Sequence, residues 1–169
     1  MKLCKNGDLD GLIQLEKEYG IDKIINHPSK NGLTPFITAT IYGHLNIVKH
    51  LVEIGYQFNA SHTNLEVLYS VVFNQCNLNK DSLIEVLTYL INELGFDINE
   101  RDILGNTLLH YAILKNKAET ANMLLDIGIN KYCQNQYSEC AFDLAPNDEI
   151  LEQIYHKHIV EYIEYMDTI

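Results

Sequence analysis

The sequence predicts an all-α repeat protein built from stacked helix-turn-helix units. Three observations support this prediction: residues 30–60 carry the signals of two short helices joined by a turn, a similar segment recurs at 103–135, and glycines mark corresponding points of successive units. One pair of short helices cannot bury its own apolar face, so such units fold only when neighbours stack on them.

The segment 30–60 explains why each unit should contain two helices. Thr34 is a favourable N-cap, and Pro35 suits the first helical position because its missing N–H costs nothing there. A first helix is therefore expected over 36–42. Gly43 can adopt the positive φ that ends a helix, and the apolar residues that follow recur at helical spacing, which predicts a second helix over 45–53.

Glycine spacing gives the repeat boundaries. Gly55, Gly95 and Gly128 follow one another at intervals of 40 and 33 residues. We expect one domain over 1–169, with an N-terminal cap repeat, three repeats, and a degenerate last repeat followed by a C-terminal helix. The middle repeat has a surplus at 74–80 that we interpret as an inter-helix insertion. The boundaries are 1–29, 30–62, 63–102, 103–135 and 136–169.

These units resemble the ankyrin repeat. Thr34-Pro35 and Gly43-His44 match it in the first clear unit, and Thr107 and His110 keep the Thr and His of its Thr-Pro-Leu-His signature. The resemblance implies an ankyrin solenoid of about four to five repeats, counting degenerate caps, with loop or β-hairpin tips. It also implies that His110 bonds to Thr107, and that Asn59 and Asn99 tie off loops.

The resemblance implies a non-catalytic module that binds a partner protein or peptide through its first helices and loop tips. Tyr42 and Tyr111 are the strongest groove candidates because a hydroxyl is costly to bury without a partner, whereas Phe73 and Leu114 could equally be core. The remaining groove candidates, from the first helices of three repeats, are Thr38, Ile41, Asn74 and Lys115. The loop-tip candidates are His62, Asn64, Arg101, Asp102, Gln136 and Tyr137.

The chain offers little catalytic chemistry. A phosphate-binding Gly-rich loop, a nucleophile elbow and a His-Glu-x-x-His motif are all missing from the sequence. Zinc would favour the thiols and imidazoles of Cys133, Cys140, His156 and His158, but the cysteine spacing is loose and the two histidines lie about 200° apart on a helix. We therefore expect no enzyme activity, cofactor or metal.

Composition narrows the class of partner. The net charge is −11, and residues 139–169 carry eight acids and one base, which disfavours nucleic acid. No apolar run is long enough to span a membrane, and the N-terminus lacks a signal-peptide pattern. Four scattered cysteines favour a reducing, cytoplasmic location. If the source is an intracellular pathogen, this would be the host cytoplasm, and the protein would be a host-directed effector or regulator.

The C-terminal segment predicts one long helix. After Pro146, apolar residues from Ile150 to Met166 recur at three- and four-residue spacing. This stripe could cover the open end of the solenoid as a cap, or pair with a second copy as a self-associating structural element. Capping is preferred, since Ile150, Leu151 and Ile154 lie where the last core layer needs closing, so a monomer is expected rather than a homodimer.

Overall fold

The computed structural model describes residues 1–20, 25, 28–56, 64–73, 80–154 and 156–168. These residues fall into two compact units, unit 1 at Met1–Phe96 and unit 2 at Asp97–Ile169. The single domain expected over the whole chain stays a prediction. In the described part of the chain the regular structure is helical, and strand pairing is limited to one isolated bridge between Gln134 and Cys140.

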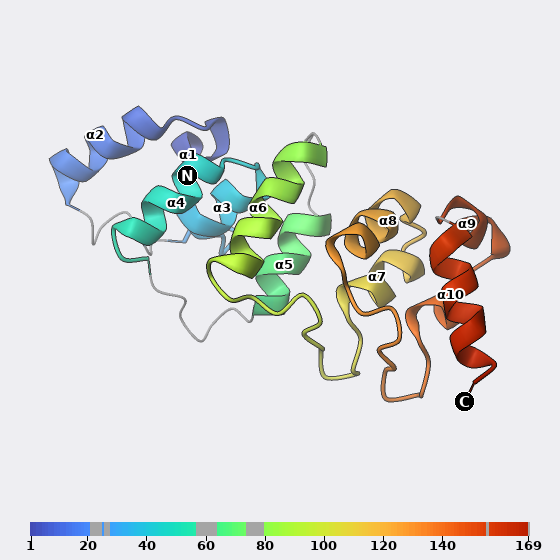
Figure 1. Ribbon diagram of the computed structural model, residues 1–169. Coiled ribbons are helices and arrows are strands. Elements are labelled where there is room, and N and C mark those ends of the chain that lie inside the picture. The colour runs from blue at the N-terminus through green and yellow to red at the C-terminus, as the bar shows by residue number, and fades with distance from the viewer. Residues whose placement is uncertain (21–24, 26–27, 57–63, 74–79, 155, 169) are drawn as a thin grey trace. The chain divides into compact units, whose positions relative to one another are not determined.

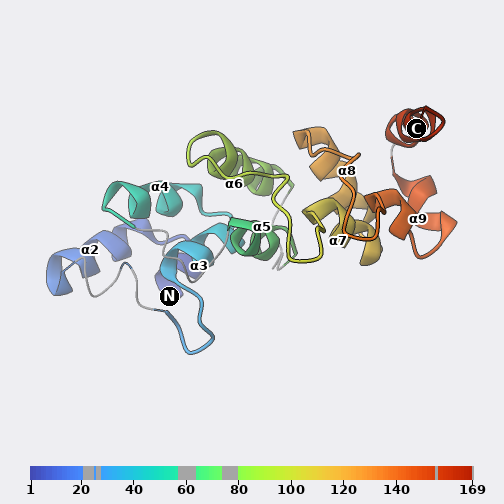
Figure 2. The same ribbon diagram turned by 90° about the horizontal axis from the view of Figure 1, so that it is seen from below.

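Unit 1 contains three pairs of helices, as the repeat pattern predicts. Its second helices α4 and α6 pack on each other, as do its first helices α3 and α5, and Figure 2 shows these as two layers. α1 packs on both α2 and α3. α1 is a short helix of five residues that precedes the longer α2 of the N-terminal cap repeat. The helices are α1 (Lys2–Asn6), α2 (Leu9–Tyr19), α3 (Pro35–Ile41), α4 (Leu45–Glu53), α5 (Asn64–Phe73) and α6 (Lys80–Asn92).

The helix signals read from segment 30–60 are confirmed. Thr34 Oγ1 accepts the N–H of Ile37 at 3.2 Å, and Pro35 occupies the first helical position of α3. Gly43 has a φ of 69°, where the chain turns from α3 into α4. α3 is buried along its whole length, so its stability comes from packing between neighbours.

Unit 2 contains one complete helix pair and a shortened last repeat. α7 packs on α8 and on the 3-10 helix η2, and α8 packs on α9. Leu108, Leu109, Ile113 and Leu124 are fully buried in this core, and each contributes about 2 kcal/mol of burial free energy. The elements are α7 (Leu108–Leu114), α8 (Ala118–Ile127), η2 (Ala141–Leu144), α9 (Asp148–Gln153) and α10 (His156–Met166) (Figure 1).

The prediction of one continuous C-terminal helix is wrong. α9 ends at Gln153, and Ile154 has an extended backbone with ψ 144°. The side chain of Asn122 in α8 donates to the Gln153 carbonyl at 3.0 Å, which satisfies a backbone acceptor that a longer helix would have used itself. The break lets α9 pack on α8 while α10 contacts the loop at 131–143 instead.

Candidate functional site

The loop before α7 is a tight turn closed by Asp102. The Asp102 N–H donates to the Asn106 carbonyl at 3.0 Å, and the Gly105 N–H donates to the Asp102 carbonyl at 2.9 Å. Asp102 Oδ1 accepts the N–H groups of Leu104 and Asn106, both at 2.8 Å. A short acidic side chain suits this position because it can bond backbone donors two and four residues ahead.

The same turn recurs 33 residues later, with Asn135 in place of Asp102. Asn135 N–H donates to the Glu139 carbonyl at 2.9 Å, and Asn135 Oδ1 accepts the N–H of Tyr137 at 2.9 Å. Ser138, at the position of Gly105, has a φ of 63°. A third copy in unit 1 begins at Ser29, so the turn belongs to the repeat rather than to one loop.

The two turns of unit 2 are bonded to each other. The Gln136 N–H donates to the Leu104 carbonyl at 2.9 Å, and its side-chain amide donates to the Ile103 carbonyl. Glycine suits position 105 for two reasons. A Cβ there would lie only 3.1 Å from the Asn135 Cα, and the backbone φ of 80° is one that other residues rarely adopt. Figure 1 shows the two loops leading into and out of the α7–α8 pair.

Tyr111 connects α7 to the first of these turns. Its hydroxyl donates to Asp102 Oδ2 at 2.5 Å. Burial alone would raise the pKa of Asp102, but hydrogen bonds from Tyr111 and from the backbone of Asn106 and Leu104 outweigh that effect and lower the pKa. The hydroxyl of Tyr111 is therefore satisfied within unit 2, and its ring is half-buried.

His110 joins the start of α7 to the second turn. Its Nδ1 accepts the Thr107 N–H at 3.2 Å, so the ring carries its proton on Nε2, which donates to the Glu139 carbonyl at 3.2 Å. Burial is the main reason that its pKa is lowered, which keeps the ring neutral. The expected bond to Thr107 is confirmed, with 2.9 Å between His110 Nδ1 and Thr107 Oγ1. The ring therefore has a structural role, joining the start of α7 to the second turn.

The turns carry three exposed apolar side chains, of which the sequence predicted Tyr137 as a site residue but not Ile103 or Leu104. Ile103 is 88% exposed and Leu104 40%, and Tyr137 in the second turn is 70% exposed. The signal was the register of the turns, because Ile103 and Leu104 occupy the tip positions held by Lys30 and Asn31 in unit 1. We name Arg101, Asp102, Ile103, Leu104, Tyr111, Gln136 and Tyr137 the loop-tip surface.

The groove predicted from the first helices is only partly at the surface. Thr38 and Ile41 are 4% and 3% exposed, so giving them a surface position was wrong: both pack inside unit 1, where α1 and α5 contact α3. Phe73 is half-buried against Tyr69, with ring centroids 4.5 Å apart. Tyr42 is half-buried beneath the Lys5 ammonium, 5.2 Å from its ring centroid.

The remaining predicted residues divide between the two units. Leu114 and Lys115 are exposed at the end of α7 in unit 2, with Leu114 at 47%. Asn64 is half-buried at the start of α5 in unit 1. His62, Asn74 and Asn59, with most of the expected insertion, lie outside the described residues. Asn99 accepts the Asn130 N–H at 2.7 Å, which confirms its structural role.

The cysteine and histidine cluster does not form a metal centre in the described residues. Among them, no group of three or more His, Cys, Asp or Glu side chains could hold a metal ion. Cys133 and Cys140 are buried free thiols. Cys140 Sγ donates to the Tyr132 carbonyl at 3.6 Å, and burial, followed by the charge of Asp143, raises its pKa. That thiol is therefore poorly suited to bind metal or act as a nucleophile.

Among the helices of the described residues, every one is too short or too polar to cross a bilayer.

Comparisons with known proteins agree with the repeat geometry. A family model described as ankyrin repeats (3 copies) matches residues 1–102, and one described as ankyrin repeats (many copies) matches residues 80–125. A predicted ankyrin repeat protein of Rickettsia bellii is 39% identical over 82 residues, which is 48% of this chain and 10% of that protein.

Two further relatives extend the match along the chain. Alpha-latrotoxin-Lg1a of Latrodectus geometricus is 28% identical over 144 residues, covering 83% of this chain and 10% of the toxin. A predicted ankyrin repeat protein of Acanthamoeba polyphaga mimivirus is 27% identical over 107 residues, covering 62% of this chain and 13% of that protein. The chain thus spans only about a tenth of the length of these relatives. The first family model covers more than half of the chain, and this protein belongs to the ankyrin repeat family.

Proposed function

We propose that this protein is a non-catalytic binding module whose loop-tip surface contacts a partner protein. Ankyrin repeats are generally protein-protein interaction modules, and the family is typically non-enzymatic. The observation that carries the proposal is the exposure of Ile103 and Tyr137, at 88% and 70%, on turns that are fixed by hydrogen bonds. Exposed apolar side chains that gather on one surface, rather than being scattered singly, are typical of protein-protein interaction sites.

The rigidity of the turns supports a binding role. The two turns are closed internally by Asp102 and Asn135 and bonded to each other through Gln136. A partner that docks on them would not have to order the loops, so less conformational entropy is lost on association. Aromatic and aliphatic anchors rimmed by Arg101 and Gln136 have the composition of an interface centre and its polar edge.

Leu114 and Lys115 extend the proposed contact along the end of α7. Both are exposed and belong to the same unit as the loop tips. Tyr42 remains a proposed contact of unit 1. We place the protein in the cytoplasm, where the buried free thiols of Cys4, Cys133 and Cys140 would stay reduced, and a regulatory or host-directed role is part of the same proposal.

The test is affinity capture with the full chain and a double variant, Ile103→Ser with Tyr137→Ser. The matched control is Lys30→Ser with Asn31→Ser, which changes the same tip positions of the turn in unit 1. We expect the unit 2 variant to lose a partner that the wild type and the control both retain. Identical partner lists for all three proteins would refute the loop-tip surface as the binding site.

A further inference from the structure

One side of α10 is used to hold it in unit 2. The Tyr162 hydroxyl donates to Asp143 Oδ1 at 2.5 Å, and its ring meets Phe142 edge-on with centroids 5.0 Å apart. One turn further on, Tyr165 contacts the ring of Tyr132 at 4.4 Å. Glu161 pairs with Lys131 on the same loop. These contacts fix the side of α10 that faces residues 131–143.

A second stripe on α10 lies outside those contacts. Ile159, Ile163 and Met166 follow one another at four- and three-residue spacing, so they share a face of the helix, and at about 100° per residue they lie roughly 40–100° round the helix from Tyr162. Ile163 is 53% exposed and Met166 37%. A helix face with this much exposed apolar surface is incomplete by itself.

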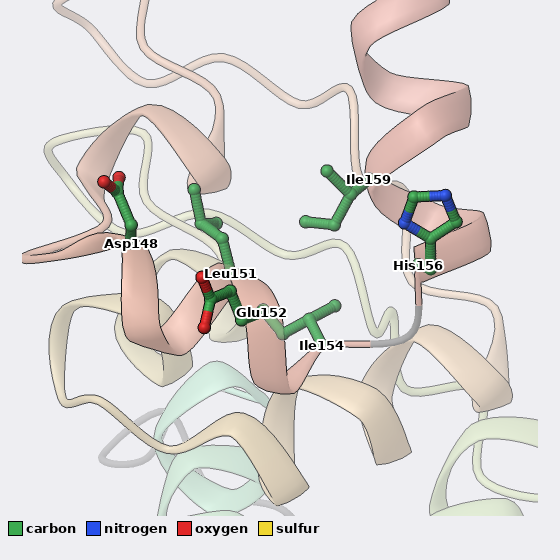
Figure 3. A pocket seen from close by; sticks show the side chains of 6 residues that line it. All are labelled: Asp148, Leu151, Glu152, Ile154, His156 and Ile159. Atoms are coloured by element: carbon green, nitrogen blue, oxygen red, sulfur yellow. The ribbon is translucent and has the colours of Figure 1, made fainter.

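The stripe continues into an open pocket between α9 and α10. Leu151 from α9, Ile154 directly after α9 and Ile159 from α10 supply its apolar lining (Figure 3). Asp148, Glu152 and His156 complete the lining, and all three are exposed. Figure 3 shows Ile159 pointing from α10 toward the side chains of α9. The pocket and the stripe together form what we name the α9–α10 surface.

We propose that the α9–α10 surface is a docking site for a basic amphipathic helix of a partner protein. An apolar stripe at three- and four-residue spacing is complementary to the apolar face of another helix. The pocket would take a large aliphatic side chain of that helix, and the carboxylates of Asp148 and Glu152 would face lysines or arginines beside it.

Charge decides between this occupant and a second copy of the chain. Residues 139–169 carry eight acids and one base, and Asp148, Glu149, Glu152, Glu164 and Asp167 are all exposed. Pairing two copies through this surface would bring like charges together, with only one base in residues 139–169 of each copy to compensate eight acids. The negative potential of these acids would attract a basic helix, which raises its association rate and stabilises the bound state. The α9–α10 surface shares no residue with the loop-tip surface, so this inference stands independently of the proposed function.

The experiment measures binding of a synthetic peptide to the full chain by fluorescence anisotropy. The probe is a labelled peptide of leucine and lysine arranged so that the leucines form one helical face. Its comparator has the same composition in an order that breaks that face. We expect the amphipathic peptide to bind at least about tenfold more tightly than the comparator, with an affinity that falls as salt is raised.

Two double variants locate the site. Ile163→Ser with Met166→Ser removes the stripe and should weaken binding about tenfold or more. Asp148→Asn with Glu152→Gln keeps the side-chain sizes, and should weaken binding about threefold and reduce the salt dependence. The control is Glu119→Gln, an exposed acid of α8, which should leave the affinity unchanged. Circular dichroism of each variant checks that the fold is retained.

Three results would overturn the proposal. Equal affinity for both peptides would mean attraction by charge alone, and unchanged affinity in both double variants would place the peptide elsewhere. The third result would be a wild-type dimer in sedimentation that becomes a monomer in the variant Ile163→Ser with Met166→Ser. That result would mean that the α9–α10 surface binds a second copy of the chain. The variant Ile103→Ser with Tyr137→Ser should bind the peptide normally, so failure of the loop-tip surface and failure of this inference are distinguishable.

Discussion

Asp102 has two separate functions in one side chain. One carboxylate oxygen accepts the backbone N–H groups of Leu104 and Asn106, and the other accepts the hydroxyl of Tyr111. The first set shapes the turn, and the second bond fixes the turn against α7. Hydrogen bonds to a carboxylate are stronger than those between neutral groups, so Asp102, together with the bonds from Gln136, fixes the position of the exposed tip at Ile103 and Leu104.

Asp102→Ala is therefore expected to lower the free energy of unfolding by about 2 kcal/mol at neutral pH. Because the folded pKa of Asp102 lies below the unfolded value of about 3.9, its stabilisation is fully present above that value. It is lost as pH falls through the lower, folded pKa. Urea unfolding at neutral and acidic pH measures the free energy of unfolding of both proteins. The difference in this free energy between wild type and Asp102→Ala should become smaller at acidic pH.

The exposed Asp167 at the end of α10 provides a control for that experiment. Asp167→Ala should change stability by less than about 0.5 kcal/mol at either pH. A gap between wild type and Asp102→Ala that stays constant down to acid pH would contradict the assigned role of the carboxylate charge.

His110 differs from Asp102 because it stabilises the fold in its neutral form, whereas Asp102 does so in its charged form. Its folded pKa is lowered, so the stability it contributes is complete above the unfolded value of about 6.5 and declines as pH falls below it. His110→Ala should cost about 2–3 kcal/mol, because the Thr107 N–H and the Glu139 carbonyl lose their partner. Thermal melts across this pH range measure both effects.

The exposed His156 is the comparison for His110. His156→Ala should have a melting temperature close to that of the wild type at each pH. In His110→Ala the melting temperature should depend less on pH than in the wild type. Equal pH profiles for wild type and His110→Ala would show that another group causes the acid destabilisation.

At the scale of elements, the local signals in the sequence were sufficient for α3 and α4. Thr34, Pro35 and Gly43 act on their own backbone, so their effect can be predicted without knowing the neighbours. The turns at 102–106 and 135–139 were likewise predictable as loop tips, because Asp, Asn and Gly determine them locally.

The break between α9 and α10 could not be predicted in this way. The apolar spacing continues unchanged through Ile154, yet its first part packs on α8 and its second part on residues 131–143. The partner of Gln153 comes from Asn122, 31 residues earlier in the chain. Periodicity likewise could not show that Thr38 and Ile41 face neighbouring helices, because a short helix between two others is covered on several sides.

Tyr162 should determine whether α10 stays attached. Tyr162→Ala removes the bond to Asp143 and the contact with Phe142, leaving α10 held mainly through Tyr165 and the Glu161–Lys131 pair. We expect hydrogen exchange of the α10 amides to become at least tenfold faster, while α7 and α8 keep their protection. Ile163→Ala, on the exposed stripe, is the matched control and should leave exchange in α10 nearly unchanged. Equal acceleration in α7, α8 and α10 would show that α10 does not detach separately.

At the scale of the whole molecule, the described contacts are local in sequence. The main helix contacts join elements of the same or an adjacent repeat, as in α3 with α1, α4 and α5, or α8 with α7 and α9. In such an array, stability is a sum of repeat terms and nearest-neighbour terms, so damage in one place need not spread evenly. The division into units at Phe96 and Asp97 predicts where that unevenness should appear.

Leu51 in α4 and Leu124 in α8 test this with matched substitutions. They occupy equivalent positions of two repeats, one in each unit, and both are 0% exposed. Leu51→Ala and Leu124→Ala should each cost about 2–5 kcal/mol, because each leaves a cavity in a packed core. Hydrogen exchange should then show lost protection in α3 and α4 for Leu51→Ala, and in α7 and α8 for Leu124→Ala. If either substitution lowers protection uniformly across all four helices, the chain unfolds as a single cooperative block, and the two units are not separate in stability.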